Sequence, residues 1–118
     1  YTPLLERQYL TADNTSESTA AYALCYKCHS RTSILANASF PRHDVHVRGA
    51  DIPCSACHDS HGISSTQGNS LNNSKLINFD TSIAKPTAGG LLKYESTGTF
   101  HGRCYLVCHG VTHNPRSY

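Results

Sequence analysis

The six cysteines of this chain form three pairs, and a histidine directly follows each pair. Two of the pairs are separated by two residues and the last pair by three. In chain order the motifs are Cys25-Tyr26-Lys27-Cys28-His29 (the first motif), Cys54-Ser55-Ala56-Cys57-His58 (the second motif) and Cys104-Tyr105-Leu106-Val107-Cys108-His109 (the third motif). Because no cysteine lies outside this pattern, a single role for the cysteine pairs should account for all three motifs, and this role constrains the fold.

Cys-x-x-Cys-His is the attachment signal of c-type haem, whose two vinyl groups react with the thiols while the histidine binds the iron as proximal ligand. Cysteines three residues apart lie on the same side of a helical turn, and a spacing of four also keeps them on one helical face. We therefore predict three covalently attached haems c. The predicted attachment residues are Cys25, Cys28, Cys54, Cys57, Cys104 and Cys108, and the predicted proximal ligands are His29, His58 and His109.

Other uses of paired cysteines explain less of the pattern. Zinc sites also use Cys-x-x-Cys spacing, but a histidine directly after a cysteine is poorly placed to chelate the same ion. A disulfide framework needs an even number of cysteines, as here, but gives no reason for three trailing histidines. A Cys-x-x-Cys redox pair would account for one motif and not for three.

The histidines outside the motifs are the expected sixth ligands of the irons. Five of the eight histidines remain, and the chain contains no Met, so His/Met ligation is excluded and ligation by two histidines is expected. We predict that His101 is not a ligand, because it has no partner at a useful spacing. The distal candidates, of which three irons need three, are His43, His46, His61 and His113.

The composition provides little apolar material for an ordinary core. Hydrophobic residues make up 38% and charged residues 15% of the 118 residues, against about 45 to 50% and about 25% in typical domains. Three haems would leave 118/3, about 39, residues for each. The porphyrins are therefore expected to pack against one another and to supply much of the buried apolar surface.

Charge and hydropathy exclude two classes of partner. The net charge is only +2, from 10 Lys and Arg against 8 Asp and Glu, which is too balanced for binding to nucleic acid or to an anionic membrane surface. No apolar run approaches the roughly 18 residues that a membrane span requires. The sequence thus predicts a protein with no nucleic-acid partner and no membrane span.

Several stretches resemble known multihaem cytochromes. Phe40–His46, followed by Pro53–His58, resembles the distal histidine pair before a haem motif in cytochromes of the c3 and c7 type. Cys54–Gly62, Leu76–Asp80 and Cys104–Gly110 together resemble the doubled-CXXCH family of secreted electron-transfer cytochromes of metal-reducing bacteria. This resemblance covers roughly residues 22 to 118. It implies that His61 and His113 are distal ligands, without implying which iron each of them binds.

The expected fold is a compact, haem-packed trihaem cytochrome, mostly irregular, with short α-helices and a small β-hairpin. Residues 1–13 are expected to form an N-terminal arm and residues 14–118 the trihaem cytochrome c domain. Helical segments are expected at 18–30, 41–47 and 54–58, with a further helical turn at the third motif. The hairpin is expected to pair residues 75–82 with residues 91–96 across a turn at 84–90.

Iron with two histidine ligands has no open position for a substrate, so electron transfer rather than catalysis is expected. Because c-type haem is attached outside the cytoplasm, the expected location is extracellular or at the cell surface, with the periplasm as the alternative. The few lysines and the arm favour a subunit of an extracellular cytochrome assembly or filament, with like subunits or other multihaem cytochromes as partners. A diffusible periplasmic carrier, exchanging electrons with periplasmic donors and acceptors, and a module of a larger cytochrome remain open.

Overall fold

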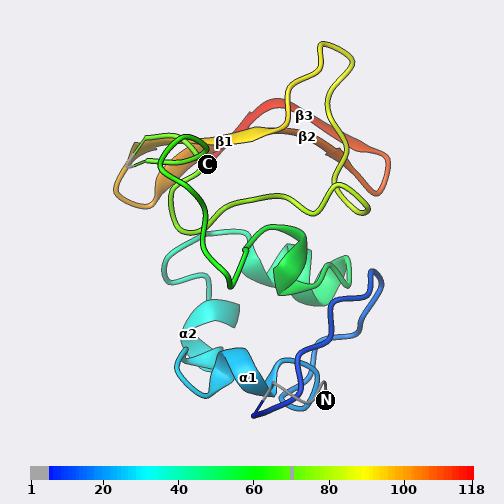
Figure 1. The fold of residues 1–118 in the computed structure, drawn as a ribbon. Helices are drawn as coiled ribbons and strands as arrows, with labels where there is room; N and C mark the ends of the chain where they lie inside the picture. Colours follow the sequence, from blue (N-terminus) through cyan, green and yellow to red (C-terminus); the bar gives the residue numbers. More distant parts are fainter. Residues whose placement is uncertain (1–5, 70) are drawn as a thin grey trace. The chain divides into compact units, whose positions relative to one another are not determined.

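The structure is a computed structural model that describes residues 6–69 and 71–118. The chain divides into two compact units, Tyr1–Cys54 and Ser55–Tyr118, each with its own cluster of buried hydrophobic side chains. Figure 1 shows short helices in the blue and cyan part of the chain and strands in the yellow to red part. The arm and domain boundaries expected from the sequence stay a prediction, and residues 1–5 of that arm lie outside the described residues.

In the first unit, helix α1 spans Ala23–Tyr26 and helix α2 spans Arg31–Leu35. The prediction of one helix over 18–30 is therefore wrong in length. Helix α2 follows Ser30, whose backbone is extended and whose hydroxyl accepts a hydrogen bond from the Ser33 amide at 3.2 Å. A serine in this conformation starts a new helix and so separates α2 from α1.

The histidine pair lies in the helical segment that was expected at 41–47. The segment begins as α-helix at residues 43–44 and continues as the π-helical turn η1, Val45–Gly49. The prediction of a short helical segment is thus confirmed, although the segment begins two residues later, ends two residues later than expected and is mostly π-helical. Single π-helical turns often occur at functional sites.

The core of the first unit is small, and part of the expected arm is attached to it. The buried residues are Ala21, Tyr22, Leu35 and Val47, against which Tyr9 packs. Backbone hydrogen bonds join Leu10 N to Ala21 O and Leu24 N to Gln8 O, both at 3.0 Å. Residues 8–10 thus belong to the packed part of the first unit.

The second unit contains a three-stranded antiparallel sheet with the order β1-β2-β3. The strands are β1 (Lys93–Gly98), β2 (His101–Cys108) and β3 (Val111–Ser117). The predicted hairpin is wrong in its pairing, because β1 overlaps residues 91–96 but pairs with β2. Lys75 and Leu76 have positive φ values of 62° and 59°, and this left-handed backbone cannot continue as a strand.

The third motif lies in β2, so the predicted helical turn at this motif is wrong. Tyr105 and Val107, with Val111 and Thr112 beyond the turn, are residues that favour extended backbone. The turn between β2 and β3 is formed by His109 and Gly110, with φ values of 46° and 74°. Two consecutive positive φ values are typical of the tight turns that suit the twist of antiparallel strands.

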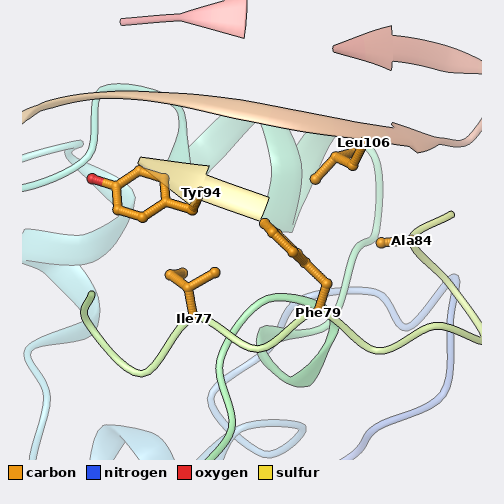
Figure 2. Packing of buried hydrophobic residues seen from close by; sticks show 5 residues of the cluster. All are labelled: Ile77, Phe79, Ala84, Tyr94 and Leu106. Atoms are coloured by element: carbon orange, nitrogen blue, oxygen red, sulfur yellow. The ribbon is translucent and has the colours of Figure 1, made fainter. Parts of the chain in front are cut away.

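The core of the second unit lies against the sheet. Figure 2 shows its five side chains, with Ile77 and Phe79 pointing from a loop toward the strand that carries Tyr94. The cluster consists of Ile77, Phe79, Ala84, Tyr94 and Leu106. Gly102 lies beside this cluster and leaves room for two tyrosine side chains. A Cβ atom at this position would lie 2.6 Å from the Tyr94 ring and 2.7 Å from the Tyr118 hydroxyl.

Few short helices and a small sheet agree with the expectation of a largely irregular fold, whereas haem packing stays a prediction. Within residues 6–69 and 71–118, no helix has the length and hydropathy needed to cross a membrane.

Candidate haem-attachment sites

The first motif forms the helical turn that its spacing predicts. The backbone N–H groups of Cys28 and His29 both donate to the carbonyl oxygen of Cys25, at 3.2 and 3.0 Å. Cys25 is half-buried at the end of α1, whereas Cys28 and His29 are exposed. The turn therefore presents one sheltered thiol, one accessible thiol and an accessible imidazole.

Cys54, the first cysteine of the second motif, lies beside Cys25 in the first unit. Both side chains pack against the cluster that contains Tyr22. The thiol of Cys54 donates a hydrogen bond to the sulfur of Cys25, which lowers the pKa of Cys25 to about 7. Two thiols that are 29 residues apart in sequence, from two different motifs, therefore meet on one apolar surface.

The second motif begins in a single 3-10 turn, η2, at Cys54–Ala56. Residues 76–80 hold the part of the motif that belongs to the second unit. Asn78 N donates to Cys57 O at 2.9 Å, and Asp80 N donates to Ala56 O at 3.0 Å. The motif is thus tied through its backbone, which leaves the Cys57 thiol and the His58 ring to be positioned by their own contacts.

His58 has the ring arrangement that is typical of a metal ligand. Its Nδ1 lies 2.9 Å from the carbonyl oxygen of Lys75. A carbonyl can only accept, so Nδ1 carries the proton and Nε2 is the nitrogen that can bind iron. The proximal role of His58 stays a prediction.

Two further histidines have the same arrangement. His46 Nδ1 lies 2.7 Å from Arg42 O, and His101 Nδ1 lies 3.1 Å from Tyr118 O. His46 was a distal candidate, whereas His101 was set aside on sequence spacing. The carbonyl that orients the His101 ring is 17 residues away, and sequence spacing gives no signal for such a contact. The prediction that His101 is not a ligand stays a prediction.

The third motif presents both of its thiols on one face of strand β2. Side chains alternate along a strand, so residues four apart share a face, whereas residues three apart do not. Cys104 and Cys108 accordingly pack, with Leu106 between them, against the core of the second unit. The extra residue of this motif therefore has a geometric reason. His109 follows in the tight turn and is exposed.

Cys57 packs against the same cluster as Cys104 and Cys108. Burial, with a smaller contribution from the charges of the Cys104 and Cys108 sulfurs, raises the pKa of Cys57 to about 12. Burial also raises the pKa of Cys104 to about 11. Three thiols from two motifs thus share one apolar surface, on which Cys57 and Cys104 are held as neutral thiols.

The distal candidates differ in their surroundings. His43 and His46 both contact the ring of Phe40, with centroid distances of 5.0 and 5.8 Å, so the pair shares one side of its helix as expected. The side chain of His61 is 95% exposed, and its backbone N–H donates to Asp59 Oδ1 at 2.9 Å. His113 is half-buried in β3, opposite Leu106 of β2.

The residues fit a covalent haem in two respects. The thiols of different motifs lie on apolar surfaces, which suit the face and edge of a porphyrin, and the contact of His58 Nδ1 with a carbonyl leaves Nε2 as the ligand nitrogen of that ring. In the described part of the chain, no three His, Cys, Asp or Glu side chains come together as a site for a metal ion alone. Sequence reasoning identified the motifs, but it gave no signal for the meeting of thiols from different motifs.

No protein-family model, curated protein or solved structure matches this chain. The functional argument therefore rests on the motifs and on the contacts of their residues.

Proposed function

We propose that this chain transfers electrons through three covalently attached c-type haems, each ligated by two histidines. The observation that carries the proposal is the repetition of a cysteine pair followed at once by histidine, which uses all six cysteines. Bound at such motifs, the haem iron gains and loses one electron without needing an open coordination position. Ligation by two histidines also implies lower potentials than ligation by methionine.

The chain contributes attachment, orientation and an apolar environment. The cysteine pairs fix each porphyrin at two points, on a helical turn at the first motif and on one strand face at the third. The Lys75 carbonyl holds the His58 ring in one orientation and makes its Nε2 a better donor to iron. The apolar clusters beside Cys25 and Cys57 keep water from the attachment edges.

The proposed setting is extracellular or at the cell surface, with the periplasm as the alternative. The proposed form is a subunit of a cytochrome assembly whose neighbours are like subunits or other multihaem cytochromes. The low lysine count of the sequence supports this form over a diffusible carrier. The attachment of residues 8–10 to the first unit leaves less of the arm to join a neighbour, so a carrier or a module of a larger cytochrome remains the alternative.

The test is the number of covalent haems in the secreted protein, produced in a host with the c-type attachment machinery. We expect an intact mass equal to the chain plus three haems, and a haem content that survives acid acetone extraction. Replacing Cys104 and Cys108 by Ala should lower the count to two. A wild-type protein that carries no covalent haem would overturn the proposal.

A further inference from the structure

We propose that the haem of the second motif is the direct neighbour of both other haems, so that electrons pass between the first and third haems through the second. This inference rests on the proposed function, because it concerns where the cysteines would hold the three porphyrins. The observation behind it is that each cysteine of the second motif lies beside cysteines of a different motif.

The first contact lies inside the first unit. Cys54 and Cys25 pack against the same four buried residues, and their thiols are joined by a hydrogen bond. A thioether connects each sulfur to the edge of its porphyrin. Because these two sulfurs are in contact, the edges of the first and second haems have to lie close together.

The second contact lies inside the second unit. Cys57 packs against the cluster that also receives Cys104 and Cys108 from β2. The 2.9 Å hydrogen bond from Asn78 N holds the backbone of Cys57 beside Asn78, and the Cys57 side chain packs against the cluster. The edges of the second and third haems therefore meet on this surface.

Together the two contacts indicate that the second haem lies next to both the first and the third haems. Its attachment cysteines are three residues apart, and one faces the first motif while the other faces the third. Each transfer moves one electron from a ferrous to a ferric iron, with no bond made or broken. The order of transfer then follows the order of the motifs in the sequence.

The test uses the haem-loaded full chain and three variants that each lack one attachment pair. These are Cys25→Ala/Cys28→Ala, Cys54→Ala/Cys57→Ala and Cys104→Ala/Cys108→Ala. Neighbouring haems give a paired positive and negative signal in the Soret region of the circular dichroism spectrum. We expect the variant without the second haem to lose this signal and the other two variants to retain it. A signal that survives undiminished without the second haem would overturn the inference.

Ser55→Ala is the matched control within the second motif. The Ser55 hydroxyl is buried and makes no hydrogen bond within the described part of the chain, so its removal should leave three haems and the full Soret signal. The intact mass of each protein separates the two proposals. A wild-type chain without three haems contradicts the proposed function, whereas three haems with a different coupling order contradict this inference alone.

A second measurement needs no substitution and so does not depend on the folding of the variants. Partially reduced wild-type protein is followed by nuclear magnetic resonance, in which each haem is resolved and its midpoint potential is recorded at every stage of reduction. Reduction of the second haem should shift the potentials of both others more than the first and third haems shift each other. A larger interaction between the first and third haems would contradict the assignment.

Discussion

Cys25 and Cys57 differ in reactivity before any haem is attached, because their sulfurs have different neighbours. Cys25 accepts a hydrogen bond from the Cys54 thiol, which favours its thiolate and lowers its pKa to about 7. Cys57 lies against an apolar cluster, and burial raises its pKa to about 12. The thiolate is the nucleophile. Cys25 should therefore react at neutral pH, whereas Cys57 should not react.

This difference predicts the pH dependence of alkylation in the full chain produced without haem. The alkylation rate of Cys25, measured by peptide mapping, should rise through about pH 7, while Cys57 stays unreactive up to about pH 10 in the folded chain. Cys54→Ala removes the hydrogen-bond donor, so the midpoint for Cys25 should move up toward the ordinary value of about 8.5.

Cys28→Ala is the control for the Cys25 prediction, because it removes the other thiol of the motif and leaves the Cys54 donor in place. Its Cys25 midpoint should match that of the unsubstituted chain. An unchanged Cys25 midpoint in Cys54→Ala would show that the two thiols do not interact in solution.

At the scale of elements, strand β2 explains why the third motif needs three residues between its cysteines. Deleting Val107 would restore the standard Cys-x-x-Cys-His spacing, yet a one-residue slip turns every following side chain to the other face of the sheet. We expect the haem count, measured by intact mass, to fall from three to two. The free energy of unfolding should fall by roughly 3 kcal/mol, near the upper end for a change at one position.

Val107→Ala is the matched control for this deletion, since it keeps the spacing and the strand register. It should retain three haems. A deletion variant that carries three haems with unchanged stability would show that the third motif does not act as a strand when it binds haem.

The elements also show what sequence patterns can and cannot predict. The helical turn at the first motif follows from a spacing of three, which fits a helix and not a strand face. A spacing of four fits both, so the third motif gave no means of choosing between them. The pairing of β1 with β2 rather than with residues 75–82 depends on the left-handed backbone at Lys75 and Leu76, which the residue types do not indicate.

The candidate site was predictable only as far as local spacing reaches. The motifs predict the attachment cysteines and the proximal histidines of the proposed haems because attachment needs residues that are close in sequence. The contact of Cys54 with Cys25 and the bond of His101 to Tyr118 join residues 29 and 17 positions apart. Contacts of this kind arise from tertiary packing and leave no periodic signal in the sequence.

At the scale of the whole molecule, all of the net charge lies in the second unit. The first unit has 5 Lys and Arg against 5 Asp and Glu, and the second has 5 against 3, which accounts for the total of +2. Neither unit therefore has more than two basic residues in excess of its acidic residues, which is a small charge for long-range attraction to an acidic partner.

The N-terminal segment contributes contacts to the packed part of the first unit. Removing residues 1–13 deletes the Tyr9 contact and the backbone hydrogen bonds of Gln8 and Leu10. We expect the free energy of unfolding to fall by about 2 kcal/mol, from lost apolar burial and hydrogen bonds. Removing residues 1–5 alone leaves these contacts in place, so it should lower the thermal midpoint of the haem-loaded chain less than removal of residues 1–13 does.

The same two truncations distinguish an effect on assembly from an effect on folding. The measurement is the size of the haem-loaded chain in solution. If the full chain forms an assembly through its N-terminal segment, removal of residues 1–13 should reduce the particles to single chains. Removal of residues 1–5 tells which part of the segment is responsible, because the first unit then keeps Tyr9 and its hydrogen bonds. A full-length chain that runs as a single subunit at high concentration would contradict the assembly and favour the diffusible carrier.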